Sequence, residues 1–196
     1  LPFVNMSEDE ANEHFSDGLS EELLNLLAKV PELKVAARTS SFHFKGKDST
    51  IADIAKALQV DTVLEGSVRR SGDTIRVVAQ LIAASDGTHL WSEKYDRQMS
   101  DIFVVQDEIA GHIVKALLPK LGAADKPVFA SGGGGITPDL YERFLIARRG
   151  FYDDTLESAK LAHQEFLAIA EAAPDHAPVH AWLARTSEVD GHLCRG

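Results

Sequence analysis

The sequence predicts an α/β domain built on a mixed β-sheet, followed by an all-α region. Three observations predict this: alternating apolar residues over Asp61–Asp96, helical apolar spacing before and after that stretch, and purely helical spacing beyond residue 137. The chain has 196 residues, of which 44% are hydrophobic, which is enough for one to two domains with a core.

Asp61–Asp96 reads as three successive antiparallel strands, a meander. Turns containing glycine, at Ser71–Asp73 and Ser85–Gly87, separate the strands. Successive side chains of a strand point to opposite faces, so the middle strand presents one wholly apolar face. The residues of that face are Ile75, Val77, Ala79 and Leu81.

Two shorter strands are expected before the meander. Leu1–Val4 reads as the end of a first strand, and Leu33–Ala37 as a second strand that leads into a polar turn at Arg38–Ser41. The first strand has an open edge, which would favour self-association.

Three helices are expected to pack on the sheet. One runs over Asp17–Val30 and stops at Pro31; the next is capped by Ser49 or Thr50 and presents Ile51, Ile54, Ala55 and Leu58 inward. The last begins at Ser100 or Asp101, carries a sustained apolar face, and is ended by Pro119 and Gly122.

We place the first domain at residues 1–122, a linker at 123–136 and the helical region at 137–196. Four consecutive glycines in the linker cannot form a packed element. After the linker, helices are expected from Pro138, over Leu156–Ala172, and beyond Pro174.

Charge argues against nucleic-acid contact by this chain. The formal net charge is −10; residues 1–122 hold 13 basic and 19 acidic side chains, and residues 123–196 hold 7 and 11. Neither part is basic, whereas phosphate binding needs clustered Lys and Arg. A single cysteine, Cys194, excludes an internal disulfide and a cysteine-rich zinc site.

The chain has no apolar run of about 18 residues, so we expect membrane association only through flanking segments. The sequence opens without an initiator Met or a signal peptide, and it ends without a clear helix stop. We interpret it as a fragment of a larger polypeptide.

We predict no catalytic residue, metal site or cofactor. Gly46-Lys47 lacks the preceding glycine of a phosphate loop, and is interpreted as a turn. His176 and His180 flank Pro178, and His176 lacks the carboxylate beside it that a zinc-protease motif demands, so both are expected to be exposed at a helix start. His112 is expected on the partly exposed flank of its helix.

Two groups of residues are candidate binding sites. Cross-strand neighbours can form a cationic and aromatic patch that accepts an anion or a peptide, from Arg69, Arg76, Trp91, Tyr95 and Arg97. The alternative, which we favour, is a solvated strand face with pairs to carboxylates such as Glu65 and Glu93. A pocket for a small molecule or envelope component is the second hypothesis, at Arg38, Ser40 and Ser41.

Small and aromatic residues recur in the helical region. Gly150, Ala162, Phe166 and Pro174 follow one another at offsets of 12, 4 and 8, as in a tetratricopeptide repeat, which this region resembles. Small residues would allow the two helices to cross closely, with Phe166 beside them. The resemblance implies a protein or peptide partner, and a repeat array that continues beyond this sequence.

The first 122 residues resemble the TolB-like N-terminal domain family. The resemblance is carried by LPFVN at the start, by FSDGLSEEL and ARTSSFHFKG, and by VLEGSVRRSGDTIRVVAQLI, HLWSEKYDR and DIFVVQDEIA, in the family's order. It implies a sensory or interaction region of a bacterial signalling protein.

That family implies several possible output modules outside this sequence. An adenylate or guanylate cyclase is the main expectation, and a membrane-bound winged-helix regulator or a ligand-binding envelope adaptor are the alternatives. A membrane span upstream would place this region on the periplasmic side of the inner membrane, which we favour over the cytoplasm.

Overall fold

The computed structural model describes residues 1–8, 12–121, 135–152 and 155–193. The chain divides into two compact units, Leu1–Ala130 and Ser131–Gly196. The linker predicted at 123–136 lies almost wholly outside the described residues, so the domain bounds stay predictions.

The first unit is built on a four-stranded sheet in the order β1-β2-β3-β4. Its strands are β1 (Val4–Asn5), β2 (Thr62–Ser71), β3 (Thr74–Ala83) and β4 (His89–Gln98). β1 pairs parallel with β2, and the other neighbours pair antiparallel. The expected α/β class, with a mixed sheet and a three-strand meander, is therefore confirmed.

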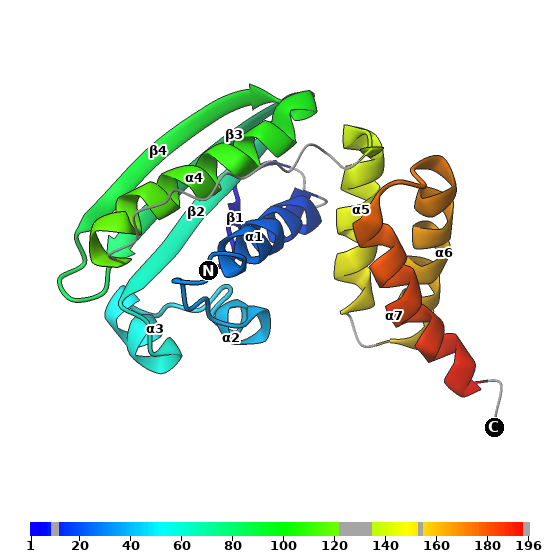
Figure 1. Ribbon diagram of the computed structural model, residues 1–196, viewed down its shortest axis with the longest axis horizontal. Helices are drawn as coiled ribbons and strands as arrows, with labels where there is room; N and C mark the ends of the chain where they lie inside the picture. The colour runs from blue at the N-terminus through cyan, green and yellow to red at the C-terminus, as the bar shows by residue number, and fades with distance from the viewer. Residues whose placement is uncertain (9–11, 122–134, 153–154, 194–196) are drawn as a thin grey trace. The chain divides into compact units, whose positions relative to one another are not determined.

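Helices α1 (Asn12–Ala28) and α4 (Ile102–Leu121) pack against one another on the same face of the sheet (Figure 1). A third helix, α3 (Ile51–Leu58), contacts β2. Thr50 caps α3 as expected, because its hydroxyl accepts a hydrogen bond from the Asp53 amide at 3.2 Å.

The core of this unit lies between the sheet and these helices. The alternation in β3 puts its predicted apolar face inward, and the same face receives the apolar stripes of α1 and α4. Fully buried side chains in this layer include Phe3, Leu19, Val68, Ile75, Val77, Ile109 and Ile113.

The predicted strand Leu33–Ala37 was wrong, so the sheet has four strands rather than five. The segment follows Pro31, and the Leu33 amide closes a turn onto the Val30 carbonyl at 3.0 Å. A short apolar run becomes a strand only where a neighbouring strand accepts its hydrogen bonds. The edge of β2 beside β3 pairs with β3, and its other edge pairs with the two-residue strand β1. Leu33–Ala37 therefore does not pair with β2.

The predicted polar turn at Arg38–Ser41 is instead most of a short helix, α2 (Arg38–Phe42). The Ser41 amide donates to the Ala37 carbonyl at 3.0 Å, and the Ser41 hydroxyl donates to the Arg38 carbonyl at 3.0 Å. Serine side chains compete for backbone groups in this way, so a polar cluster does not distinguish a turn from one helical turn.

Two helix ends also differ from expectation. α1 begins at Asn12, five residues before the predicted start, and α4 passes Pro119 to end at Leu121. A proline removes one backbone donor, and near the end of a helix with a packed apolar face that loss is small.

The second unit consists of α5 (Pro138–Phe151), α6 (Leu156–Ala172) and α7 (Ala177–Leu193). α6 packs against both α5 and α7. Thr137 and Thr155 cap α5 and α6 by accepting hydrogen bonds from the amides of Leu140 and Ser158.

Candidate functional site

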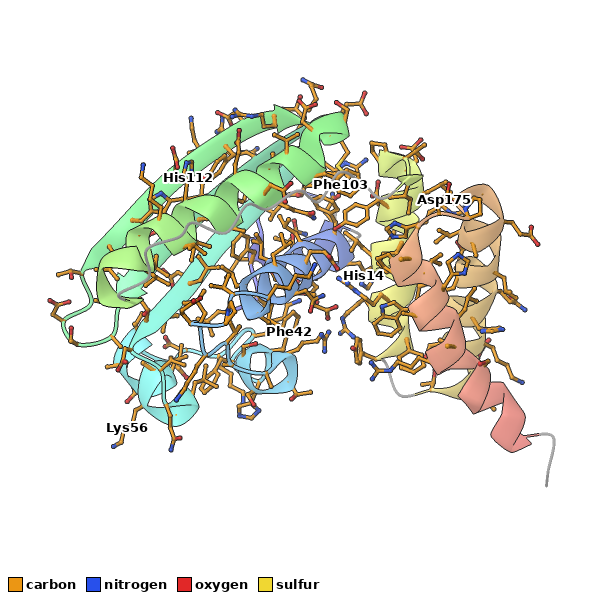
Figure 2. All side chains as sticks on the ribbon, viewed as in Figure 1. His14, Phe42, Lys56, Phe103, His112 and Asp175 are labelled. Carbon is orange, nitrogen blue, oxygen red and sulfur yellow. The ribbon has the colours of Figure 1, made fainter. Side chains whose placement is uncertain are left out.

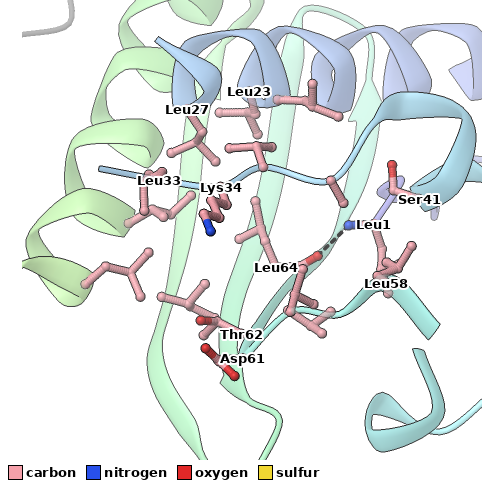
Figure 3. A pocket seen from close by; sticks show the side chains of 18 of the residues that line it. Leu1, Leu23, Leu27, Leu33, Lys34, Ser41, Leu58, Asp61, Thr62 and Leu64 are labelled. Carbon is pink, nitrogen blue, oxygen red and sulfur yellow. Dashed lines mark hydrogen bonds between the residues drawn. The ribbon is translucent and has the colours of Figure 1, made fainter. Parts of the chain in front are cut away.

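A cavity of about 420 Å³ lies at one end of the sheet of the first unit (Figure 3). Its walls come from α1, the extended segment before α2, the start of β2 and the inner face of α4. Apolar side chains dominate the lining, among them Leu23, Leu27, Leu33, Val35, Leu64 and Ile113. Its volume and character are those of a small-molecule site.

The two serine hydroxyls that line the cavity already make hydrogen bonds to the backbone. Ser20 donates to the Ser16 carbonyl at 2.7 Å and accepts from the Phe3 amide at 2.8 Å. Ser41 donates to backbone carbonyls of α2. The cavity therefore offers an apolar wall, and its charged lining side chains, Glu32, Lys34 and Asp61, belong to exposed residues.

Backbone groups form part of the cavity wall. The Leu1 amine donates to the Leu64 carbonyl at 2.8 Å, which continues the direction of the β1–β2 pairing (Figure 3). The extended Leu33–Ala36 segment lines the opposite part of the cavity without belonging to a strand.

The residues predicted at Arg38–Ser41 differ in their relation to this cavity. Ser41 is buried and lines it, whereas Ser40 is exposed and does not. The Arg38 guanidinium pairs with the Glu21 carboxylate on α1 and lies 4.2 Å from the Phe42 ring centroid. Arg38 therefore fastens α2 to α1, and ligand binding beside Ser41 stays a prediction.

The structure does not bring the predicted cationic and aromatic residues together as one patch. Arg69 and Arg76 are paired across β2 and β3 on the face of the sheet that α1 and α4 leave open. Trp91, Tyr95 and Arg97 lie opposite inward residues of β3, and hence on the face that α4 covers. Period-two alternation separates the two groups.

Two arginines of this set, Arg76 and Arg97, have carboxylate partners, although not those expected. Arg76 pairs with Asp96, with Nε–Oδ1 at 2.5 Å, and Arg97 pairs with Glu108 on α4 at 3.2 Å. The hydrogen bond from Arg76, and to a lesser extent that from Lys94, lowers the pKa of the Asp96 carboxyl below its usual range. All four side chains of the two pairs are exposed, so such pairs contribute little to stability.

A cluster that sequence reasoning missed joins β4 to α4. Tyr95 donates its hydroxyl to the Glu93 carboxylate at 3.0 Å and lies 2.8 Å from His112 Nδ1. His112 projects from α4 beside β4, 40% exposed, and is also 2.8 Å from Glu93 (Figure 2). Burial, and next the hydrogen bond to Glu93, raise the pKa of the Tyr95 hydroxyl.

The signal for this cluster was present in two separate patterns. Glu93 and Tyr95 are two residues apart, so they share a strand face, and His112 lies on the flank of an amphipathic helix. The sequence did not indicate which helix flank would lie over β4.

The predicted repeat residues are placed differently in the helical unit. Phe166 is fully buried, with its ring 5.7 Å from those of Phe144 and Trp182, and Ala162 is buried. A side chain added at Gly150 would meet no atom within 4 Å, so close helix crossing does not explain this glycine. Pro174 is exposed.

Gly150 instead lines a second cavity of about 410 Å³ between α5 and α6. Ile146 and Leu161 line it too, and both are exposed. This is apolar surface that a further helix would cover in a longer helical array.

The two histidines expected to be exposed differ from one another. His176 is 5% exposed and lies edge-on to the Phe144 ring at 5.4 Å, so the prediction for it was wrong. His180 is exposed, and its Nε2 lies 2.7 Å from the Pro174 carbonyl. Within the described residues, no three His, Cys, Asp or Glu side chains are grouped as metal ligands would be.

Comparison with known proteins gives a relative in sequence and several distant structural likenesses, two of which are described below. No family model matches the chain. It is 41% identical over 184 residues to "Putative adenylate cyclase 3" of Rhizobium meliloti (strain 1021), a match that covers 94% of this chain and 31% of that protein. The chain thus spans about a third of the length of that relative.

The structural likenesses are to the LpoB C-terminal domain from Salmonella enterica and to lipoprotein GNA1162 from Neisseria meningitidis. The first has a TM-score of 0.39 and 21% identity over 49% of this chain and 77% of that one. The second has a TM-score of 0.42 and 19% identity over 63% of this chain and 94% of that one. Neither is similar enough to carry a functional argument.

No helix among the described residues combines the length and the apolar character that crossing a membrane requires.

Proposed function

We propose that this chain is a non-catalytic sensory and protein-interaction region that regulates an adenylate or guanylate cyclase module in a larger bacterial signalling protein. The observation that supports this most is the extent of its similarity to the Rhizobium meliloti protein. Nearly the whole chain is matched, yet it accounts for 31% of that protein, which leaves most of its length for an output module.

The two units suit different parts of this role. The α/β unit, which we propose to be TolB-like, holds a largely apolar cavity that is suited to recognition of an apolar ligand. The helical unit, which we propose to be the start of a tetratricopeptide array, would take a protein or peptide partner on the concave surface that such an array presents. The resemblance favours the periplasmic side of the inner membrane.

The experiment uses the full-length polypeptide that contains this region. Ala36 lines the cavity, whereas the adjacent Ala37 is exposed and does not line it. Ala36→Trp would fill the cavity, and Ala37→Trp is the matched control. We expect Ala36→Trp to change the rate of cyclic nucleotide formation at unchanged protein level, while Ala37→Trp leaves that rate unchanged.

Two results would contradict the proposal. Absence of nucleotide cyclase activity in the full-length protein would contradict the proposed cyclase output module. If the cyclase rate is the same in both tryptophan variants and in the unmodified protein, the cavity does not regulate the cyclase.

A second candidate function, small-ligand binding by an adaptor without cyclase output, is favoured by the cavity itself. An apolar fluorescent probe tests it directly, because a dry apolar site enhances the emission of such a probe. Emission that Ala36→Trp abolishes and Ala37→Trp preserves would support binding. Emission that is equal in both variants would place the probe elsewhere.

A further inference from the structure

We propose that the outer edge of β4 is a self-pairing surface, on which two copies of this chain pair antiparallel about Tyr95. This joins two four-stranded sheets through one ladder. β4 is the last strand in the sheet order, and no described strand pairs with its other edge. The inference is independent of the cavity and of any cyclase activity.

The hydrogen bonds of the sheet determine which backbone groups of β4 point outward. Leu64 and Val68 of β2 accept bonds from Leu1 and Met6 on the β1 side. Backbone groups of successive residues point to alternate edges of a strand. The even-numbered residues of β2 therefore bond toward β1, and its odd-numbered residues bond to their even-numbered partners in β3.

The same alternation continues into β4. The odd-numbered residues of β3 bond to Glu93, Tyr95 and Arg97 of β4. Even-numbered residues therefore direct their N–H and C=O groups away from the sheet: Ser92, Lys94, Asp96 and Gln98. The Asp96 carbonyl indeed accepts a bond from the exposed guanidinium of Arg97 at 3.1 Å, which a second strand would displace.

Charge order selects one register among those that these backbone groups allow. With Tyr95 opposite its own copy, Lys94 lies across from Asp96 and Glu93 across from Arg97, each twice by symmetry. The Lys94–Asp96 pair lies on the open face of the sheet and the Glu93–Arg97 pair on the α4 face, so the two members of each pair lie on the same side of the ladder. Every charge in the centre then meets its opposite.

The neighbouring registers place like charges together. A shift of one residue about the axis puts Lys94 against Lys94 or Asp96 against Asp96, and a shift of two puts Glu93 against Glu93 or Arg97 against Arg97. Like charges directly opposite destabilise a strand pair. A charged edge strand normally repels other strands, and this one excludes most partners while accepting a second copy of itself.

Lys94 and Asp96 are available for this pairing, whereas Glu93 and Arg97 would exchange their contacts with His112 and Glu108 for one another. Lys94 is 57% exposed and Asp96 is 41% exposed, and the ion pair they form within one strand can be exchanged for the pair between copies. Arg76 still reaches Asp96 from β3, so each Asp96 would be held by a cation from both strands.

Charge reversal in two separate variants tests the register. Lys94→Glu and Asp96→Lys each create two like-charge pairs in a dimer of identical chains. Both variants should weaken the dimer by roughly tenfold or more in dissociation constant. In an equimolar mixture the reversed charges become complementary, so a mixed dimer should recover the original affinity. Lys56→Glu, exposed on α3 away from β4 (Figure 2), is the matched control and should leave the affinity unchanged.

Sedimentation equilibrium of the 196-residue chain measures these affinities. Cross-linking gives a second readout, because Ser92 of one copy lies opposite Gln98 of the other in this register. In a Cys194→Ser background, Ser92→Cys mixed with Gln98→Cys should form a disulfide between chains, while either variant alone should not. A monomeric unmodified chain, a dimer that neither charge reversal weakens, or a mixture that does not recover would each overturn the proposal.

Discussion

Gly66 on β2 is a position where one added methyl group should destabilise the α/β unit. Gly66 lies opposite Ala79, on the face of the sheet covered by the helices. A Cβ atom there would overlap the Val78 carbonyl oxygen and lie 3.0 Å from Cζ and 3.1 Å from Cε1 of the buried Phe3 ring. Gly66→Ala therefore forces the Phe3 ring and the β2–β3 ladder to move.

The expected magnitude comes from two opposing effects. Overpacking a well-packed core costs about 1–3 kcal/mol. The loss of glycine flexibility in the unfolded chain returns about 0.4–1 kcal/mol. We therefore expect Gly66→Ala to lower the free energy of unfolding of this unit by about 1–2 kcal/mol.

Gly111 on α4 provides a matched control of opposite sign. An added Cβ at Gly111 meets no atom within 4 Å, so Gly111→Ala gains helix propensity without a clash. This change should raise the free energy of unfolding by about 0.5–1 kcal/mol.

Native-state hydrogen exchange of the amides in β2 and β3 measures both changes within this unit alone, separate from the helical unit. Exchange should become faster in Gly66→Ala and slower in Gly111→Ala. A Gly66→Ala protein as stable as the unmodified chain would refute the overlap with Val78 and Phe3.

Three further predictions concern single side chains. Phe166→Ala should cost the helical unit about 3–5 kcal/mol in thermal unfolding, because a fully buried ring is lost, while Leu167→Ala at an exposed position should cost far less. Thr50→Ala should cost about 1 kcal/mol in urea unfolding through loss of the α3 cap, and Thr50→Asn should retain most of that stability; equal losses would contradict the cap. The raised pKa of Tyr95 means that the folded state holds this proton more tightly than the unfolded state. The contribution of the protonated Tyr95 hydroxyl to the free energy of unfolding is complete below the ordinary tyrosine pKa of about 10 and is lost as pH rises above it. Tyr95→Phe removes this contribution, so the variant should lose less stability at alkaline pH than the unmodified chain.

Local periodicity explains why the meander was predictable. The alternation around Ile75 and Val77 needs only neighbouring residues to be read, and the structure buries both side chains. The Thr50 cap was predictable for the same reason, since the capping residue and its partner are three residues apart.

Features that depend on distant partners were not predictable. Leu33–Ala37 has strand-like composition, but none of the described strands pairs with it. The burial of His176 depends on Phe144, 32 positions earlier in the chain. The proposed patch failed as a single surface because its members fall on opposite faces, which the register of β2, β3 and β4 determines.

The pairing of β1 with β2 has a consequence for the order of folding. Leu1 and Leu64 are 63 residues apart, whereas the β2–β3 hairpin closes across a two-residue turn. Closing the longer loop costs more chain entropy, so the hairpins should form first and β1 should join the sheet late. The start of the chain would then also be the first part of the sheet to detach, ahead of global unfolding.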